Sequence, residues 1–452
     1  MSPAEAAARA IAATLRQHGH IAYLAGGCVR DRLLGRPAKD YDIATDAVPE
    51  RVRSLFPRTV PVGAHFGVIL VLDDSTQTEV ATFRADAAYE DGRRPISVRF
   101  SSPQEDAQRR DFTINGMFLD PASDEVIDYV GGREDLRAGV VRAIGDADAR
   151  IYEDRLRMLR AVRFAARLGF DIEPKTFAAI GRSAVSISDI SAERIGDEIV
   201  KMLTDSSGGS ARRAFELLDS TDLLAVVLPE IAAMKGVEQS PDYHPEGDVF
   251  LHTLKLLEQL EQPSETLGLA ALLHDVAKPL CAGRKGERIT FYGHCERGAE
   301  MAVAVCQRLR RSRETWERVE MLVRDHLRLV DAPLMRTSTL KRFLALPWID
   351  ELLQLARLDG LASSGDLTAL EFCLAKLEQL PNEEIRPKPL ITGRDLIELG
   401  LQPGPQFGEI LHAVSDAQLE GMLADKQQAL AWVAANYGTR EAPAAGESQR
   451  EG

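Results

Sequence analysis

The sequence has few cysteines, no long apolar run and no excess of positive charge, and each shortage narrows the classes of protein to which it can belong. Its 452 residues include 5 cysteines, none of them in a CxxC pair. That spacing argues against a disulfide framework and indicates free thiols in a reducing compartment. No apolar run reaches about eighteen residues, and the Ala-rich N-terminus carries Glu5, Arg9 and Arg16, so we expect neither a membrane span nor a signal peptide. We therefore expect a cytoplasmic protein with no membrane partner.

Positive charge is scarce overall, because 69 acidic residues outweigh 55 lysines and arginines and give a formal net charge of −14. A protein that binds nucleic acid is expected to present a basic face. The charge is unevenly distributed, however, since arginine recurs densely between Arg84 and Arg167 while many acids lie in the later half. A local basic groove is therefore compatible with an acidic chain, because the local potential matters more than the net charge.

The stretch from Ala25 to Thr45, AGGCVRDRLLGRPAKDYDIAT, carries the first chemical signal. The apolar residues 21–24 before it predict a buried strand, and the run Cys28–Leu34 predicts a short helix. Gly26 and Gly27 separate the two. A strand–Gly-Gly–helix junction offers backbone N–H groups and a helix N-terminus, which together suit a phosphate.

Two aspartates in the DYD sequence that follows, Asp40 and Asp42, point to the same side of an extended strand because side chains alternate faces. Adjacent carboxylates repel each other, and Mg²⁺, which prefers oxygen ligands, removes that repulsion. A phosphate-binding turn followed by a carboxylate pair is what nucleotidyl transfer requires. The order GG, short helix, DxD resembles the catalytic head of the nucleotidyltransferase superfamily. Glu79, on a later predicted strand, is either a third acidic group near the metal or a solvent-facing glutamate.

Further strands and a loop complete the predicted head. The runs Val68–Leu72 and Thr78–Phe83 flank a DDST turn and predict a hairpin, which joins the earlier strands in a small mixed sheet. The polar segment Arg84–Phe100 predicts a mobile loop. After it, Arg110 offers a fork of donors that suits phosphate oxygens, and Asp111 suits a ribose hydroxyl.

The segment from Ile151 to Phe170 predicts one long helix. Asp154, Arg157, Arg160 and Arg163 lie about one turn apart and would share one face of it. That face is either a salt-bridged solvated surface or a site in which Asp154 and Arg157 hydrogen-bond the edge of a nucleobase. A carboxylate accepts from an exocyclic amine and a guanidinium donates to ring acceptors, so the pair would select cytosine and adenine.

Three segments, GGCVRDRLLGRPAKDYDIAT, RRDFTINGM and YEDRLRMLRAVRFAARLGF, resemble in order and spacing the class II tRNA nucleotidyltransferase and bacterial poly(A) polymerase family. The resemblance covers roughly the first half of the chain. It implies template-independent addition of CCA to the 3′ end of tRNA from CTP and ATP, with Mg²⁺ held by Asp40 and Asp42. The residues that it implies for nucleotide binding are Gly26, Gly27, Arg30, Arg110, Asp111, Glu153, Asp154, Arg157, Arg160 and Arg163.

The second half of the chain contains a separate set of histidines and aspartates in helical contexts. His274 and Asp275 are adjacent, His252 and His294 flank them, and Asp359 comes later. A single histidine is usually an ordinary helix residue, but the set resembles the HD phosphohydrolase superfamily. Imidazole and carboxylate ligands suit Ni²⁺, Mn²⁺, Fe or Zn²⁺. The resemblance implies either an active domain or a helical body that only docks tRNA.

These patterns together predict an α+β protein, in which a small mixed-sheet nucleotidyltransferase head precedes a mostly α-helical neck, an HD-type body and a tail. The head would span 1–148 and the neck, which would select the base and bind RNA, 149–228. The HD domain would span 229–388, a helical tail segment 389–438, and a disordered end 439–452.

Other functions remain open at this point. An enzyme that adds only the terminal A, or a poly(A) polymerase, would share the motifs of the head. A metal-dependent phosphohydrolase whose head only binds RNA is an alternative from another class. A non-catalytic tRNA-binding protein is a further one, against which the intact GG and DxD sequences argue. The sequence makes no prediction of the oligomeric state.

Overall fold

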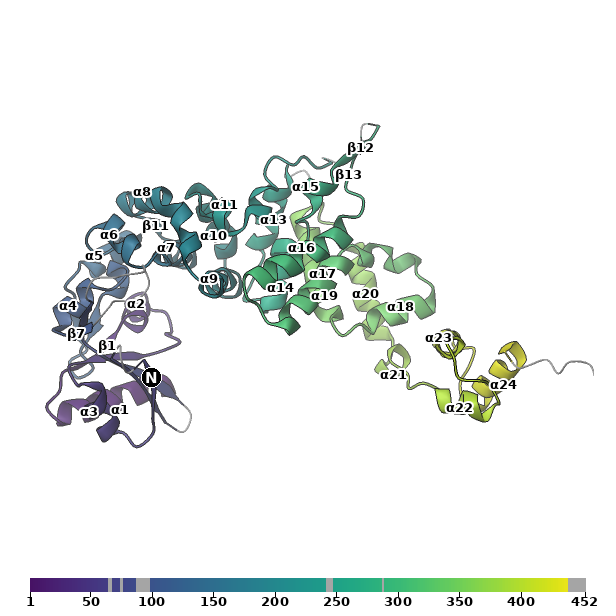
Figure 1. Ribbon diagram of the computed structural model, residues 1–452, viewed down its shortest axis with the longest axis horizontal. Helices are drawn as coiled ribbons and strands as arrows, with labels where there is room; N and C mark the ends of the chain where they lie inside the picture. Colours follow the sequence, from purple (N-terminus) through teal and green to yellow (C-terminus); the bar gives the residue numbers. More distant parts are fainter. Residues whose placement is uncertain (64–66, 74–75, 87–97, 241–246, 287, 438–452) are drawn as a thin grey trace, which may run out of the picture. The chain divides into compact units, whose positions relative to one another are not determined.

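The computed structural model describes residues 1–63, 67–73, 76–86, 98–240, 247–286 and 288–437, and Figure 1 shows their helices and strands. The chain divides into two compact units, Met1–Glu320 and Met321–Gly452, and each is described by itself. The predicted disordered end, 439–452, and residues 87–97 of the predicted loop lie outside the described residues.

A mixed seven-stranded sheet forms the centre of the predicted head, in the order β3-β4-β5-β2-β1-β8-β9. Its strands are β1 Ala22–Ala25, β2 Asp42–Thr45, β3 Thr59–Gly63, β4 Val68–Leu72, β5 Gln77–Thr82, β8 Phe118–Leu119 and β9 Val126–Ile127. The predicted hairpin is confirmed, because β4 and β5 pair antiparallel. β2 and β5 run parallel, so the prediction of a mixed sheet is also confirmed.

Three aromatic rings on this sheet fix the strands that lead into the Gly-Gly turn. Phe83 and Phe118 are fully buried and meet edge to face with ring centroids 5.9 Å apart. Tyr23 of β1 lies 6.1 Å from Phe118. Edge-to-face packing of this kind adds to the free energy gained by burial, so the end of β1 is held firmly. The helices around the sheet are α1 Pro3–Gln17, α2 Gly27–Leu33, α3 Pro49–Leu55, α4 Pro103–Gln108 and α5 Gly132–Ala138.

The prediction of a loop throughout Arg84–Phe100 is wrong at both ends of the segment. β6 Arg84–Asp86 pairs antiparallel with β7 Val98–Phe100, so that Arg84 lies opposite Phe100. The polar composition concealed these strands, because strand formation depends on the cross-strand partner more than on intrinsic preference.

The prediction of one helix over 151–170 is also wrong. Two helices occupy the region, α6 Ala147–Glu153 and α7 Arg157–Leu168. Asp154 ends α6 in an extended conformation, φ −146° and ψ 102°, and its carboxylate accepts a hydrogen bond from the Leu156 N–H at 3.1 Å. A local bond of this type competes with the helical backbone pattern, whereas the apolar periodicity continues across the break.

Helices form almost all of the rest of the first unit. A short parallel pair, β10 Val140–Val141 and β11 Asp171–Ile172, joins residues on either side of the predicted boundary at 148. Ser191 is the N-cap residue of α9, although its side chain makes no capping hydrogen bond. The further elements are η2 Thr113–Asn115, α8 Pro174–Ser183, η3 Ala184–Asp189, α9 Ala192–Thr204, α10 Ser210–Ser220, α11 Leu223–Val227, α12 Pro229–Ala232, α13 Val249–Glu258, α14 Glu265–Leu273, α15 Lys278–Cys281, β12 Gly283–Lys285, β13 Arg288–Thr290, α16 His294–Arg308 and α17 Arg313–Asp325, in which the division between units falls.

The second unit is helical throughout its described residues. It contains η4 Arg328–Leu334, α18 Thr337–Leu344, α19 Ile349–Ala362, α20 Thr368–Gln379, α21 Asn382–Ile385, α22 Gly393–Glu398, α23 Gln406–Leu419 and α24 Lys426–Tyr437. Leu396, Ile410 and Val433 belong to a core of their own that joins the last three helices. The α+β class is therefore confirmed. Within the described parts of the chain, no helix combines the length and the apolar character of a membrane span.

Gly196 allows α9 to approach the C-terminal end of α16, and this contact yields a prediction for stability. A Cβ at Gly196 would lie 2.4 Å from the carbonyl oxygen of Leu309, whereas a Cβ at Gly181 of α8 would meet nothing within 4 Å. We expect Gly196→Ala to lower the free energy of unfolding by about 1–3 kcal/mol, since backbone must move. Gly181→Ala should leave it unchanged or raise it by up to about 1 kcal/mol. Urea unfolding measures both, and equal effects would contradict the assignment of a close approach.

Candidate active site

The predicted strand–Gly-Gly–helix junction is present. β1 ends at Ala25 and α2 begins at Gly27, with Gly26 between them at φ 74° and ψ −128°. A Cβ on Gly26 would lie 3.2 Å from Nη1 of Arg110, so both the backbone conformation and the space favour glycine. The N–H of Gly26 donates to the carbonyl oxygen of Met117 at 3.3 Å. The amides available to an anion are therefore those in the first turn of α2.

The carboxylates of Asp40 and Asp42 lie at the start of β2, although only Asp42 belongs to the strand. The parallel register pairs Ile43 with Val80 and thereby sets Asp42 beside Glu79 of β5. Opposite residues of a ladder point to the same face of the sheet. Three acidic side chains therefore gather here, and Glu79 is the one whose position the sequence left open.

This acidic cluster (Asp40, Asp42 and Glu79) is electrostatically unbalanced. Partial burial, followed by the charges of Glu79 and Asp40, raises the pKa of Asp42 to about 6, while Arg110 acts in the opposite direction. Asp42 is nevertheless exposed at the surface, so its carboxylate is accessible to ligands. Among the described residues, none of the three carboxylates forms an ion pair. Oxygen ligands with uncompensated charge fit a hard divalent cation such as Mg²⁺.

Arg110 lies between the Gly-Gly turn and the acidic cluster, and a buried carboxylate orients it. Asp106 of α4 accepts from Arg110 Nη2 at 3.1 Å and from Arg109 Nη2 at 2.6 Å. Although burial alone would raise it, the two arginines hold the pKa of Asp106 below its usual value. The guanidinium of Arg110 also stacks over the ring of Phe118, 5.1 Å from its centroid. Sequence reasoning missed Asp106, because no motif marks it.

Asp111 is the centre of a hydrogen-bond network rather than a free acceptor. Its Oδ2 accepts from Arg160 Nε and Nη2 at 2.9 and 2.6 Å, and its Oδ1 accepts from Asn115 Nδ2 at 3.2 Å. Asn115 in turn accepts from Arg30 Nη1 at 2.7 Å, and Arg30 Nε donates to Asp31. Arg30 is only 3% exposed, and burial lowers its pKa. Arg30 is therefore a buried residue that holds Asn115 in position.

Three arginines surround the ring of Phe164 on α7. The guanidinium carbons of Arg163, Arg30 and Arg160 lie 4.3, 5.2 and 5.3 Å from the ring centroid. Arg163 Nε also donates to the buried carboxylate of Glu198 in α9 at 2.6 Å. Cation–π contacts of this type attract the guanidinium groups to the ring face. Neither Phe164 nor Glu198 is among the site residues predicted from the sequence.

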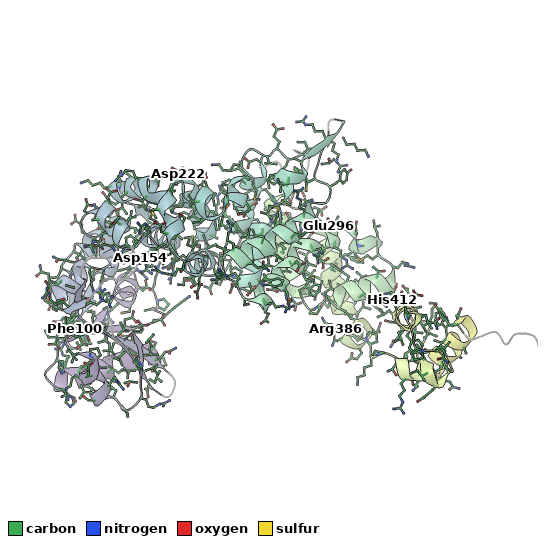
Figure 2. All side chains as sticks on the ribbon, viewed as in Figure 1. Phe100, Asp154, Asp222, Glu296, Arg386 and His412 are labelled. Atoms are coloured by element: carbon green, nitrogen blue, oxygen red, sulfur yellow. The ribbon has the colours of Figure 1, made fainter. Side chains whose placement is uncertain are left out.

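Glu153, Asp154 and Arg157 come together at the break between α6 and α7, where Figure 2 labels Asp154. Glu153 Oε2 accepts from Arg157 Nη1 at 2.6 Å, and Arg157 Nη2 donates to the Arg109 carbonyl at 3.1 Å. Asp154 is instead held by Arg194 of α9, whose Nη2 donates to Oδ2 at 2.9 Å. Asp154 and Arg157 therefore do not share one helical face as predicted. Arg194 orients Asp154, whereas Glu153 and the Arg109 carbonyl orient Arg157.

A second cluster of predicted site residues is buried among α13, α14 and α16. His274 Nε2 lies 3.3 Å from His252 Nε2 and 3.2 Å from Asp275 Oδ2. Asp275 Oδ1 lies 3.6 Å from His294 Nε2, and Oδ2 accepts from Lys278 Nζ at 2.7 Å. One ligand atom from each of His252, His274 and Asp275 lies within 4.8 Å of the others, a spacing that could surround one ion.

Backbone contacts and nearby charges give this buried cluster features that a metal site requires. Nδ1 of His274 and of His294 faces a backbone carbonyl, at 3.0 and 2.7 Å, which leaves Nε2 as the ligand atom. Although burial opposes ionisation, Lys278 and His274 hold the pKa of Asp275 well below its usual value. Burial lowers the pKa of His294, which favours the neutral form that binds metals. Asp359, the remaining predicted ligand, belongs to α19 of the second unit.

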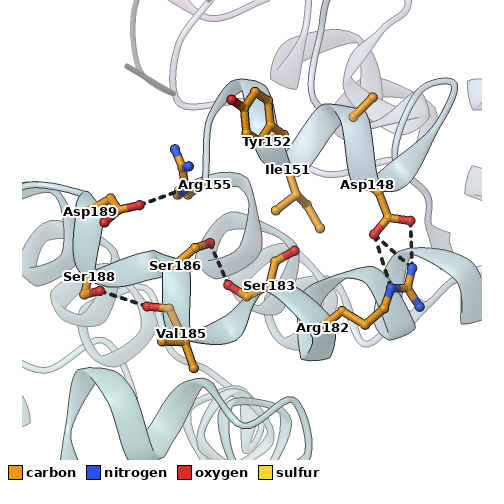
Figure 3. Close-up of a pocket in the computed structure, with 11 residues that line it drawn as sticks. Asp148, Ile151, Tyr152, Arg155, Arg182, Ser183, Val185, Ser186, Ser188 and Asp189 are labelled. Atoms are coloured by element: carbon orange, nitrogen blue, oxygen red, sulfur yellow. Dashed lines mark hydrogen bonds and ion pairs between the residues drawn. The ribbon is translucent and has the colours of Figure 1, made fainter. Parts of the chain in front are cut away.

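A hollow of about 730 Å³ beside α6 and α8, drawn in Figure 3, contains none of the predicted site residues. Its two arginines are neutralised within it, because Arg155 pairs with Asp189 at 3.2 Å and Arg182 with Asp148 at 2.7 Å. The hollow therefore offers no spare charge for an anion.

The raised pKa of Asp42 yields a prediction for the metal-free protein. Above pH ~6 the folded state must hold this carboxylate charged against Glu79 and Asp40, whereas in the unfolded chain it ionises near the ordinary aspartate pKa of 3.8. This unfavourable contribution grows as the pH rises from about 4 to 6 and is absent below about 4. We expect Asp42→Asn to raise the melting temperature in EDTA at pH 8 by roughly a few degrees. The same substitution should leave the melting temperature at pH 4 unchanged.

The control for this prediction is Asp148→Asn on α6, whose carboxylate pairs with Arg182 away from the acidic cluster. It should not raise the melting temperature at either pH. Stabilisation by Asp42→Asn that was equal at pH 4 and pH 8 would contradict the electrostatic explanation.

Three models of protein families match parts of the chain. Residues 22–142 match the "Poly A polymerase head domain". Residues 169–235 match a segment described as "Probable RNA and SrmB-binding site of polymerase A". Residues 298–434 match "tRNA nucleotidyltransferase domain 2 putative".

Individual relatives that align with the chain are named CCA-adding enzymes. A CCA-adding enzyme of Geobacillus stearothermophilus is 46% identical over 233 residues, which are 51% of this chain and 56% of that protein, so the chain spans about half the length of several relatives that it matches. A CCA-adding enzyme of Levilactobacillus brevis is 33% identical over 433 residues, 94% of this chain and 96% of that protein. The solved CCA-adding enzyme of Bacillus stearothermophilus in complex with CTP has a TM-score of 0.71 and 30% identity, and covers 96% of this chain and 97% of that one. Because one relative aligns along nearly its whole length and a solved relative shares its fold, the chain belongs to the family of CCA-adding enzymes.

Proposed function

We propose that this protein adds the 3′-terminal CCA to tRNA, using CTP and ATP. The observation that carries the proposal is the acidic cluster of Asp40, Asp42 and Glu79 beside the Gly-Gly turn and Arg110. The names of its relatives, one of them solved with CTP, support the same reaction. A cytoplasmic location suits an enzyme that acts on tRNA, and it suits five free cysteines.

In the proposed reaction, the 3′-hydroxyl of the RNA attacks the α-phosphorus of the nucleotide, and the bond to pyrophosphate breaks. Asp40 and Asp42 would hold two Mg²⁺, with Glu79 beside them. When bound, these ions lower the pKa of the attacking hydroxyl and neutralise charge on the leaving pyrophosphate. No protein side chain is then needed as a base.

Residues of the head and of α7 would orient the nucleotide. Arg110, fixed by Asp106, and the first-turn amides of α2 face the position that suits the phosphates. Arg160 is held by Asp111, and both surround the same site. Arg30, Arg163 and Phe164 lie behind them and keep the arginines in place.

Asp154 and Arg157 would read the nucleobase. Asp154 offers a carboxylate acceptor, and Arg157 offers donors whose direction Glu153 sets. On their Watson–Crick edges, cytosine and adenine present an amine beside a ring acceptor, whereas uracil and guanine do not, so one pair of side chains accepts both correct bases. Arg194 would keep Asp154 in position.

We expect Asp154→Ala to reduce the preference for CTP over UTP by roughly 10- to 100-fold, because a base matched to Asp154 loses its acceptor. Single-nucleotide incorporation with each of the four triphosphates measures the preference. Asp148→Ala removes a carboxylate of α6 outside the base site and should leave the preference intact. Unchanged selectivity in Asp154→Ala would show that Asp154 does not select the nucleobase.

The decisive test of the function uses three tRNA transcripts that end at the discriminator base, at C and at CC. Each is incubated with Mg²⁺ and CTP, ATP or both, and read at single-nucleotide resolution. Growth of all three to one CCA end is the expected result. Extension of the CC transcript alone would identify an A-adding enzyme, and a long ladder with ATP would identify a poly(A) polymerase. Asp40→Ala should abolish extension.

A specific observation favours a second proposal, that the buried cluster of His252, His274, Asp275 and His294 holds a transition metal as in HD domains. Its ligand atoms converge within 4.8 Å for the first three residues, and imidazole with carboxylate suits Ni²⁺, Mn²⁺, Fe or Zn²⁺. Lys278, which donates to Asp275 at 2.7 Å and to Gln239 at 2.6 Å, would offer a cation to a phosphate ester bound at this cluster. Asp359 stays a predicted ligand.

We expect His274→Ala to lower the amount of bound transition metal at least several-fold, because a buried site loses one of its ligands. Metal analysis of the purified protein measures this. His412→Ala, at an exposed histidine of α23, is the matched control and should keep the metal. Equal metal content in wild type and His274→Ala would contradict the proposal, and CCA addition should persist in both variants because the acidic cluster is intact.

A further inference from the structure

A buried glutamine, Gln239, lies one side chain away from the buried cluster of histidines and Asp275. Gln239 is only 4% exposed, and its Oε1 accepts a hydrogen bond from Lys278 Nζ at 2.6 Å. The same Nζ donates to Asp275 Oδ2 at 2.7 Å. Lys278 therefore links the amide of Gln239 to a carboxylate of the buried cluster. All three residues belong to the first unit.

The contact with Lys278 fixes the direction in which the amide of Gln239 faces. A lysine ammonium only donates hydrogen bonds, so the atom that meets it must be the amide oxygen and not the amide nitrogen. Nε2 of Gln239 therefore points away from Nζ. This nitrogen is buried and has no hydrogen-bond partner among the described residues. A buried donor without an acceptor costs free energy, so Nε2 indicates a position for a ligand or an ordered water.

The backbone beside Gln239 is attached to the helix that carries His252. Glu238 pairs with Asp248 in an antiparallel bridge, and Asp248 is the N-cap residue of α13. The carboxylate of Asp248 also accepts from the Gly236 N–H at 2.6 Å. The segment that carries Gln239 is therefore held at the start of α13, which keeps the amide in place relative to the buried cluster.

The charges of the buried cluster favour an anion once a metal is bound. Asp275 is the one carboxylate among its four residues, and Lys278 already neutralises it. The imidazoles of the cluster must be neutral in order to bind a metal. A divalent ion on these side chains therefore carries positive charge that they do not balance. This excess attracts an anionic ligand, because charges interact strongly in a buried site.

The surroundings of Lys278 strengthen a hydrogen bond to such an anion. Lys278 is 7% exposed, and its Nζ lies 5.3 Å from the centroid of the Phe291 ring. The carbonyl oxygen of Phe291 also lies 2.7 Å from Nδ1 of His294, so this residue borders both the ammonium and the buried cluster. Hydrogen bonds are electrostatically stronger where water is scarce.

We propose that Gln239 binds an oxygen of a tetrahedral oxyanion, inorganic phosphate or a phosphate ester, that is held at the buried cluster. Its Nε2 donates to this oxygen, while its Oε1 keeps Lys278 in position to neutralise the same anion. The assignment rests on the proposed metal site, since the metal supplies the charge that attracts the anion.

The test separates a direct hydrogen bond to the anion from an effect that passes through Lys278. Gln239→Met keeps the length of the side chain and removes both its donor and its acceptor, and Lys278→Met removes the cation. The two single variants, the double variant and the wild type are each loaded with Ni²⁺ as full-length proteins. Gln307→Met, at an exposed position of α16, is the matched control.

Three quantities are measured for each protein. Titration calorimetry gives the affinity for inorganic phosphate, and titration of the metal-free form allows phosphate binding at the nucleotide site to be subtracted. Metal analysis gives the Ni²⁺ content. Thermal unfolding shows that each variant is folded.

We expect Gln239→Met to hold as much Ni²⁺ as the wild type, because Gln239 is not a ligand of the metal. It should bind phosphate about 10- to 100-fold more weakly, the loss expected for one hydrogen bond to a charged group. In the Lys278→Met background, Gln239→Met should still weaken phosphate binding several-fold, because Nε2 meets the anion itself. Gln307→Met should bind phosphate like the wild type.

Two results would overturn the inference and leave the metal site standing. Unchanged phosphate affinity in Gln239→Met would show that Nε2 meets only water. Equal phosphate affinity in Lys278→Met and in the double variant would show that Gln239 acts only through Lys278. A wild type that holds no Ni²⁺ after loading would instead overturn the proposed metal site, and the inference with it.

Discussion

Every buried guanidinium must find an acceptor, and this requirement joins the head of the molecule to its neck. α7 directs an arginine inward about once per turn. Arg160 meets Asp111 of the head at 2.6 Å, and Arg163 meets Glu198 of α9 at 2.6 Å. Arg163 and Glu198 are both buried, and removing one partner from such a pair leaves an uncompensated charge at a cost of about 3–5 kcal/mol. The orientation of α7, and with it the placement of the site, therefore depends on these few pairs.

Paired and unpaired charges divide the protein into scaffold and ligand sites. Where both members of a pair are present, as in Asp106 with Arg110, the side chains are fixed and preorganised. Where negative charge predominates, as in the acidic cluster, a bound cation would neutralise the excess. A net charge of −14 conceals this division, because it sums both kinds of region.

The sequence allowed local features to be predicted and left tertiary ones open. The Gly-Gly turn and the β4–β5 hairpin were predictable, because glycine, turn residues and alternation encode them within a few positions. The break at Asp154 was not, since one side-chain hydrogen bond to Leu156 decides it while the apolar pattern continues. The place of Glu79 required the register of β2 on β5. Arg194, which no nearby residue implicates, meets Asp154 across 40 positions of sequence.

The short parallel pair of β10 and β11 has a consequence for how such proteins can be recombined. Val141 is bonded through the ladder to Ile172, beyond the whole of α6 and α7. A head that was cut at residue 148 and joined to the neck of a relative would separate two strands that belong to one unit. A crossover placed after residue 172 would instead carry both strands together, along with Asp154, Arg157 and Arg160. Such an exchange would therefore transfer the residues that we propose select the base together with the head, so that on this proposal chemistry and specificity are inherited as one piece.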